Sequence, residues 1–337
     1  MEKTAVILVN LGTPEQPTKP KVRDFLSEFL NDPLVIDLPY IARKILVNLI
    51  IIPFRAGKST KMYQKIWTEE GSPIMVHMRT LFDRLKQKPN KALDYYFAMR
   101  YGRPSLAEVL KKINTNGYEK LFIIPMFPQY ADSTTGSVIE KSKEVLKQIN
   151  YRGNVNFQTE FYRHKAFIQT WKSKLKSIEY QKFEHILFVF HGLPVRQTER
   201  KHTGHSCSEM RCKTQIYESN RQCYFAQCQD NSRILAAELG IEKSKYTVCF
   251  QSRFGKKWLE PFADKIIEEK AKQGIKSLLV VPLSFVADCL ETKLEIEIEY
   301  TDLFMENGGE KFVMAESLNS CDDWVGALSQ IIADNKV

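Results

Sequence analysis

Three glutamates recur at every fourth position near the end of the chain: Glu291, Glu295 and Glu299. They follow residues 277–283, an apolar run typical of a buried strand. On a helix this spacing places them on one side, each rotated by about 40° from the last. Stacked carboxylates repel one another, and a bound cation or bound protons would offset that repulsion. Two alternatives stay open: a half-buried strand over residues 294–300, and a solvated helix face.

A histidine and an arginine also stand at the ends of strand-like segments. His191 follows the apolar run 186–190 and precedes Gly192 and Pro194, which restrict the backbone. It is placed to act as a base or a metal ligand near neutral pH, with a structural histidine as the alternative. Arg100, followed by Tyr101, is suited to hold a carboxylate, with a solvated arginine in a turn as the alternative.

Residues 133–135, Ser-Thr-Thr, precede a helix-like segment and predict an N-cap, with an anion nest as the second interpretation. Four of the seven cysteines lie close together, with the spacing C-x4-C, ten residues, C-x4-C. This is not the C-x2-C pattern of a zinc ribbon.

Strand-like and helix-like segments alternate along all 337 residues, which predicts an α/β fold of parallel sheets covered by helices. The length favours two such sheets with a cleft between them, and ligands bind at the carboxyl ends of the strands. The expected strands are residues 5–9, 94–99, 120–124, 155–159, 185–190, 246–251, 277–283 and 311–314. The expected helices are residues 21–30, 105–113, 137–149, 165–178, 231–239, 258–272 and 323–333.

The net charge of +9 favours an anionic partner, but no zinc-finger, RNP or basic-zipper pattern supports nucleic acid. The longest apolar run, residues 45–54, is too short to span a bilayer. A strand-like segment begins at residue 5, which leaves no room for a secretory signal and predicts a cytoplasmic protein. Residues 34–75 combine an apolar run with Arg55, Tyr63 and Trp67, and predict a flap over a membrane or a flat apolar ligand. A helical hairpin packed on the sheet is the alternative.

Taken in order, several motifs resemble those of the ferrochelatase family: VNLGTP (9–14), RY (100–101), PQY (128–130), STTG (133–136), FHGLP (190–194), FQSRFG (250–255) and ADCLET (287–292). They cover nearly the whole chain. The resemblance implies two Rossmann-like domains with the active site in the cleft between them. It implies insertion of Fe²⁺ into protoporphyrin IX, the last step of haem synthesis.

The resemblance also implies the site residues. His191 and Glu291 match the two cleft residues that bind metal or accept protons, and Glu295 and Glu299 match an acidic ladder on a widened helix. Five positions match the porphyrin pocket: Arg55, Tyr63, Ser72, Arg100 and Tyr101. Residues 34–75 match the pocket lip, which implies peripheral contact with the inner face of the cell membrane. Cys289 replaces a histidine of many relatives, and Leu11 excludes a metal ligand at its position.

We expect an N-terminal domain of residues 1–163 that includes the returning helix 324–337, and a C-terminal domain of residues 164–323 that carries a cysteine insert at 200–228. Some bacterial members of the family carry a [2Fe–2S] cluster, so the resemblance implies one here on Cys207, Cys212, Cys223 and Cys228. A zinc site and free thiols are the alternatives.

Other functions stay open within this pattern. A chelatase for coproporphyrin, sirohydrochlorin or cobalt would serve a substrate with more carboxylates and need more pocket Arg and Lys. A non-catalytic haem-binding protein would need an axial ligand but no proton relay, so the acidic ladder counts against it.

Overall fold

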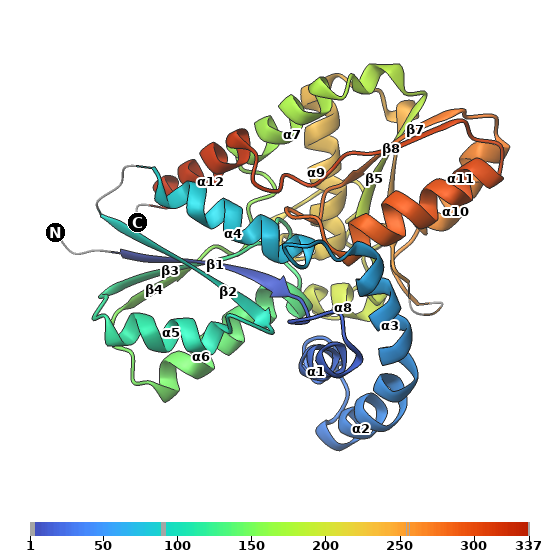
Figure 1. Cartoon of the computed structure of the whole chain (residues 1–337). Helices are drawn as coiled ribbons and strands as arrows, with labels where there is room; N and C mark the ends of the chain where they lie inside the picture. The colour runs from blue at the N-terminus through green and yellow to red at the C-terminus, as the bar shows by residue number, and fades with distance from the viewer. Residues whose placement is uncertain (1–3, 89–91, 254, 256, 336–337) are drawn as a thin grey trace.

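The computed structural model describes residues 4–88, 92–253, 255 and 257–335, and these residues form two parallel four-stranded sheets covered by helices (Figure 1). The strand orders are β2-β1-β3-β4 and β6-β5-β7-β8, and all pairs are parallel. The predicted α/β class is confirmed. The strands are β1 (Thr4–Gly12), β2 (Leu93–Tyr101), β3 (Lys120–Pro125), β4 (Asn154–Phe157), β5 (His185–His191), β6 (Tyr246–Gln251), β7 (Ser277–Pro282) and β8 (Lys311–Met314).

The α-helices of the described residues are α1 (Lys19–Leu30), α2 (Tyr40–Ile45), α3 (Ile52–Ile66), α4 (Pro73–Lys86), α5 (Leu106–Thr115), α6 (Ser137–Gln148), α7 (Lys165–Ser177), α8 (Val195–Glu199), α9 (Tyr224–Leu239), α10 (Ala263–Lys272), α11 (Tyr300–Glu306) and α12 (Asp322–Asp334). Three segments are π-helices: η1 (Leu46–Ile51), η2 (Asp132–Gly136) and η7 (Glu291–Glu299). Two 3₁₀ turns matter below, η4 (Arg200–His202) and η5 (Glu218–Asn220).

The central strands are apolar on both faces because helices cover both sides of each sheet. In β1, Ala5, Ile7 and Val9 pack with α5 and α6, whereas Val6 and Leu8 face the opposite side. This period of two is the geometry of a strand, and burial of both faces explains why the run reads as continuously apolar. The sequence signal for this strand was therefore unambiguous.

One large apolar cluster joins the two sheets. It extends from β1 and β3 through α4, α7, α9 and α12 to β5. Trp324 of α12 packs on Phe161 and Phe167, with ring centroids 5.8 and 5.9 Å apart. Because this cluster contains residues from both sides of positions 163 and 324, the domain boundaries remain a prediction.

Two expected helices differ from the structure. The helix expected at 231–239 already begins at Tyr224. The helix expected at 258–272 begins only at Ala263, because the residues before it pair as extended backbone. There, the Leu259 N–H donates to the Leu193 carbonyl at 2.9 Å, and Phe250 donates to Pro261 at 2.9 Å.

The expected N-cap at residues 133–135 is also wrong. The helical segment begins at Asp132, so these hydroxyls lie inside η2, and its first residue has no side-chain cap. The π-helix η2 runs directly into α6, which a search for capping residues ahead of a single α-helix does not anticipate.

Residues 34–75 form a helical projection that we call the lip (Figure 1). It consists of the helices α2, η1 and α3, and its inner face packs on α1 through Val47, Ile52 and Ala56. Leu294 of η7 belongs to the same apolar cluster, so the lip also contacts the acidic segment. Among the described residues, no helix combines the length and apolar character needed to cross a membrane.

His185, at the start of β5, predicts a loss of stability in acid. Burial, with Lys270 and Lys245 nearby, lowers its pKa to about 4, and its Nε2 lies 2.9 Å from Thr247 Oγ1. The unfolded chain binds this proton near pH 6.5, so acidification through the window from about 6.5 to 4 favours unfolding. We expect the free energy of unfolding to fall by about 2 kcal/mol between pH 7 and pH 5 through this group. In urea titrations, the free energy of unfolding of His185→Gln should depend less on pH than that of the wild type. An equal pH dependence in the two proteins would contradict the role given to His185.

Candidate active site

The acidic ladder lies on the π-helix η7, which follows β7 and continues as α11. The half-buried strand expected as an alternative is excluded. A π-helix has about 4.4 residues per turn, so a step of four falls about 30° short of a full turn and keeps the glutamates roughly aligned. Leu294 and Ile296, between them, are buried in the lip cluster and in the second domain's core. The apolar residues Leu294 and Ile296 thus anchor the helix, and its glutamates lie on the remaining surface.

Exposure increases along the ladder. Glu291 and Glu295 are half-buried, and Glu299 is exposed. Glu297 is also exposed and pairs with Lys293, so it lies outside the row, as its spacing predicts. The ladder therefore connects the interior to the surface.

Glu295 is tightly held. Its carboxylate accepts hydrogen bonds from the Ser252 amide at 2.8 Å, from the Tyr300 hydroxyl at 2.8 Å, and from Ser252 Oγ. Ser252 adopts a φ of 59°, which is uncommon for a residue with a side chain. Gln251 Nε2 lies 3.4 Å away. These donors fix the direction of the carboxylate.

Glu291 lies beside two buried groups at the head of the ladder. Burial raises the pKa of Tyr63 well above its ordinary value, and the negative charge of Glu291 adds to this, while Arg55 opposes it. Burial likewise raises the pKa of the Cys289 thiol, and Glu291, which accepts a hydrogen bond from it, raises it further. The structure thus brings Glu291, Tyr63 and Arg55 into one electrostatic neighbourhood, although they come from η7 and the lip.

His191 ends β5 and is half-buried. Its Nδ1 lies 2.7 Å from the Gly192 carbonyl, which can only accept, so Nδ1 carries the proton of the neutral ring. Nε2 then keeps a free lone pair for a proton or a metal. Ser284 Oγ accepts from the His191 amide at 3.1 Å, and the Tyr224 hydroxyl donates to its carbonyl at 2.9 Å. The backbone of His191 is therefore fixed on both sides.

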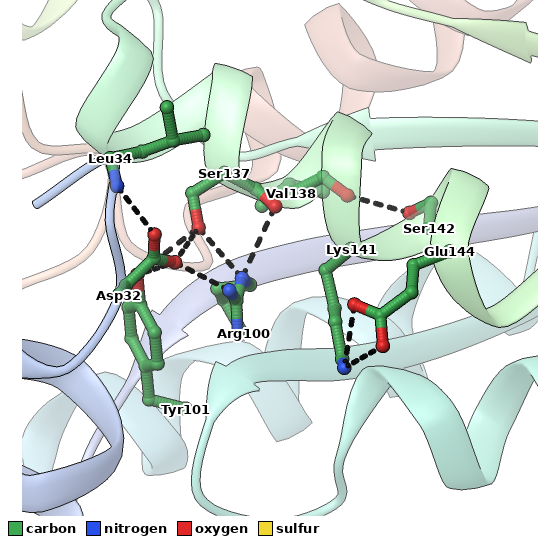
Figure 2. A network of polar contacts seen from close by, with 9 residues as sticks. All are labelled: Asp32, Leu34, Arg100, Tyr101, Ser137, Val138, Lys141, Ser142 and Glu144. Atoms are coloured by element: carbon green, nitrogen blue, oxygen red, sulfur yellow. Dashed lines mark hydrogen bonds and ion pairs between the residues drawn. The ribbon is translucent and has the colours of Figure 1, made fainter. Parts of the chain in front are cut away.

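Arg100 and Tyr101 belong to a network centred on Asp32, which the sequence did not single out (Figure 2). Asp32 Oδ2 accepts from Arg100 Nη2 at 2.5 Å, Tyr101 Oη at 2.9 Å and Ser137 Oγ at 2.6 Å. Burial raises the pKa of Tyr101. In this structure the carboxylate held by Arg100 is that of Asp32, whose side chain is 3% exposed.

Ser72 lies at the start of α4 and is buried. Its Oγ accepts a hydrogen bond of 2.8 Å from Thr13 Oγ1, which follows β1. This bond links the first strand end to the base of the lip and leaves the Ser72 proton free to donate. The predicted pocket residues thus divide into the lip pair Arg55 and Tyr63, and groups with internal partners.

The cysteine insert gathers a different set from the one predicted. His202, Cys207, Cys212 and Cys223 hold their ligand atoms within 4.8 Å of one another. Cys228 is not in this group and packs in the large apolar core. It lies five residues after Cys223 at the start of a helix, a step that turns it by about 140°, and its assignment as a cluster ligand stays a prediction.

Known proteins resemble this chain along nearly its whole length. The family model for ferrochelatase matches residues 3–336. The chain is 38% identical over 332 residues to a ferrochelatase of Coxiella burnetii (strain CbuK_Q154), covering 98% of this chain and 93% of that protein. It is 38% identical over 331 residues to a ferrochelatase of Legionella pneumophila (strain Lens), covering 98% of both.

Solved structures share the fold at low identity. SirB from Bacillus subtilis with Fe³⁺ has a TM-score of 0.55 and 11% identity, covering 98% of this chain and 95% of that one. The sirohydrochlorin chelatase SirB from Bacillus subtilis subspecies spizizenii in complex with cobalt has a TM-score of 0.54 and 9% identity, covering 97% and 93%. With the family match across the chain, the conclusion is direct: this protein belongs to the ferrochelatase family.

Proposed function

We propose that this ferrochelatase inserts Fe²⁺ into protoporphyrin IX between the lip and η7, with His191 and Glu291 as the residues nearest the reacting nitrogens. The observation that carries this proposal is the ladder on η7, whose inner end neighbours the lip and whose outer end is exposed. Ferrous iron is the substrate metal, and protohaem and two protons are the products.

His191 is suited to accept a pyrrole proton. Metal insertion removes two N–H protons, which need an acceptor that works near neutral pH. The bond from Nδ1 to the Gly192 carbonyl orients the ring and leaves Nε2 basic. The proton is taken up at Nε2, while Nδ1 stays bonded to the Gly192 carbonyl.

The ladder is suited to move cations or protons. Its carboxylates are hard oxygen ligands, and their exposure increases from Glu291 to Glu299. Glu295, held by four donor groups, is fixed in position midway along this path. In the proposed reaction Glu291 accepts one proton or guides the metal. Glu295 and Glu299 then exchange that proton or metal ion with solvent.

The lip supplies the walls of the pocket. A flat porphyrin resists metal entry because its nitrogens point in-plane, and contacts at the rim can provide the energy to bend it. Tyr63 is buried at the inner face of the lip, whereas Arg55 is exposed and free to reach a propionate. Ser72, at the base of the lip, has a proton to donate to the same substrate.

Arg55→Lys should weaken protoporphyrin binding roughly tenfold, because lysine reproduces a bidentate contact with a carboxylate poorly. Fluorescence titration of the porphyrin measures this, and Lys58→Arg, an exposed substitution on the same helix, should bind as the wild type does. The wild-type protein and Arg55→Lys should bind the propionate ester of the porphyrin with equal affinity. An equal loss of affinity for the ester would contradict the contact.

We further propose that the protein is cytoplasmic and that its lip rests on the inner face of the cell membrane. Its outer surface exposes six large apolar side chains: Tyr40, Ile41, Ile45, Leu49, Ile50 and Phe54. Lys44, Lys58 and Lys61 lie on the same helices and complement anionic lipid.

The double variant Leu49→Ser, Phe54→Ser should bind anionic vesicles at least tenfold more weakly in a sedimentation assay. These side chains are 69% and 84% exposed, and burying one apolar side chain contributes about 1.5–3 kcal/mol. Met305→Ser, which removes an exposed apolar group from α11, is the control and should leave binding unchanged. Vesicle binding that survives the double substitution would contradict the proposed membrane face.

The family resemblance also predicts a [2Fe–2S] cluster on Cys207, Cys212, Cys223 and Cys228. In the compact group that the structure forms, His202 stands where this prediction has Cys228, which packs in the large apolar core. No step of the reaction requires such a cluster, since iron enters and remains as Fe²⁺.

Substrate choice tests the proposal against its alternatives. Rates with protoporphyrin IX, coproporphyrin and sirohydrochlorin should rank protoporphyrin IX first, because Arg100 is already paired with Asp32 and is not free for additional carboxylates. A higher kcat/KM for sirohydrochlorin would favour the second chelatase class, whose fold this chain shares. Binding of haem without any metal insertion would favour a carrier.

A further inference from the structure

The insert contains a compact group of metal-binding side chains outside the candidate active site. His202 ends η4, Cys207 and Cys212 lie in the loop that follows, and Cys223 precedes α9. His202, Cys212 and Cys223 are buried, and Cys207 is half-buried. Three sulfurs and an imidazole thus converge in the interior of a polar loop.

Three of the distances within the group match one tetrahedral ion. Cys207 Sγ lies 3.7 Å from Cys223 Sγ, and His202 Nε2 lies 3.5 Å from Cys207 Sγ and 3.4 Å from Cys212 Sγ. With Zn–S near 2.3 Å and Zn–N near 2.0–2.1 Å, the edges of a tetrahedron are about 3.8 Å between sulfurs and about 3.6 Å between sulfur and nitrogen. The observed edges agree to within about 0.2 Å of these values.

A two-iron cluster would need a wider frame. Its ligands sit on two separate irons, so sulfurs at opposite ends lie roughly 5.5 Å apart or more. All four ligand atoms here lie within 4.8 Å of one another.

The surroundings of the group suit thiolates. Asn220 Nδ2 lies 3.7 Å from Cys212 Sγ and also donates to the carbonyls of Met210 and Gln215, both at 3.1 Å. Thr198 Oγ1 lies 3.6 Å from Cys207 Sγ. The Asn220 amide thus bonds to the backbone on both sides of Cys212 and holds this ligand in place.

Within the described residues, the ring nitrogens of His202 contact only cysteine sulfurs. Its Nε2 faces only the two sulfurs, and its buried Nδ1 has no hydrogen-bond partner there. Burying a polar ring without such bonds is costly, and a bond from Nε2 to a metal would offset that cost.

We propose that His202, Cys207, Cys212 and Cys223 bind one Zn²⁺ in a closed tetrahedral site. Four protein ligands leave no open position, so the ion is structural. Three cysteine sulfurs and one histidine nitrogen are a common ligand set of structural zinc.

The site would fix a junction between the insert and the lip. The segment just before His202 carries Arg196 and Arg200, which both pair with Asp37 in the lip. On the other side, Cys223 precedes Tyr224, whose hydroxyl holds the carbonyl of His191. Zinc at this position would tie both contacts to one rigid point.

Metal and sulfide analysis of the full-length protein, purified without oxygen from cells supplied with iron and zinc, tests the proposal. We expect one zinc per chain, no acid-labile sulfide and no colour. Replacing zinc by Co²⁺ should give the intense visible bands of tetrahedral cobalt with thiolate ligands. Brown protein with two irons and two sulfides per chain, or folded protein without metal, would overturn the proposal.

Matched variants locate the ligands. His202→Ala should lose zinc at least tenfold more readily to a chelator, His202→Cys should restore retention, and Cys228→Ser should retain one zinc. His191→Ala should also retain it, which separates this site from the chelatase reaction. Loss of the metal in Cys228→Ser with full retention in His202→Ala would overturn the assignment. If His202→Ala fails to fold, the wild-type sulfide content and the Cys228→Ser result still decide.

Discussion

His191→Ala is expected to lower the rate of iron insertion by about 10²–10⁴-fold, the usual contribution of a positioned acid–base group. The reason is local: Nδ1 is committed to the Gly192 carbonyl, so only Nε2 can take a proton from the porphyrin. Affinity for protoporphyrin IX should change little, because the imidazole acts on the central nitrogens and the rim contacts come from the lip. Stopped-flow absorbance measures the rate, and fluorescence titration measures binding.

His205→Ala is the matched control, since His205 is exposed in the insert and lies outside the proposed site. It should react at the wild-type rate. Near-normal insertion by His191→Ala would contradict its role as proton acceptor. A parallel loss of porphyrin affinity would instead indicate that His191 shapes the pocket.

Glu291→Gln should lower kcat on the order of 10²-fold or more, because the amide keeps the shape of the side chain but neither accepts a proton nor attracts a cation. Glu291 is half-buried beside Tyr63 and Cys289, where its charge is poorly screened. Steady-state rates across Fe²⁺ concentrations would show whether kcat or the apparent KM for iron changes.

Glu297→Gln gives the comparison on the same helix. Glu297 is exposed and paired with Lys293, and a surface ion pair contributes little. The iron-insertion rate of Glu297→Gln should therefore remain within about twofold of the wild-type rate. Equal losses in both variants would mean that the row of glutamates is only a charged surface.

The sequence predicted those features that depend on short-range pattern. The apolar runs of β1 and β5 identified the central strands, because a strand covered on both faces must be apolar throughout. The four-residue spacing of Glu291, Glu295 and Glu299 indicated one helix face, and the structure places it on a π-helix.

Long-range pairing was not predictable from pattern. Asp32 is 68 residues from Arg100 and 105 from Ser137, and an Asp before a proline signals only a turn. Its role as the internal partner of Arg100 depends on how α1, β2 and α6 meet.

The fourth member of the cysteine group was missed for a different reason. His202, Cys207 and Cys212 are spaced by five residues each, a regularity present in the sequence. Counting cysteines alone led to Cys228 instead, whereas the compact group in the structure contains His202. A search that included histidine in the pattern would have found the set.

The most direct measurement is anaerobic incubation of the wild-type protein with Fe²⁺ and protoporphyrin IX, followed by visible absorbance. We expect loss of the free-base bands, appearance of one protohaem for each porphyrin consumed, and release of two protons for each. If the porphyrin binds but its free-base bands disappear no faster than in a protein-free control, the proposed iron insertion would be contradicted.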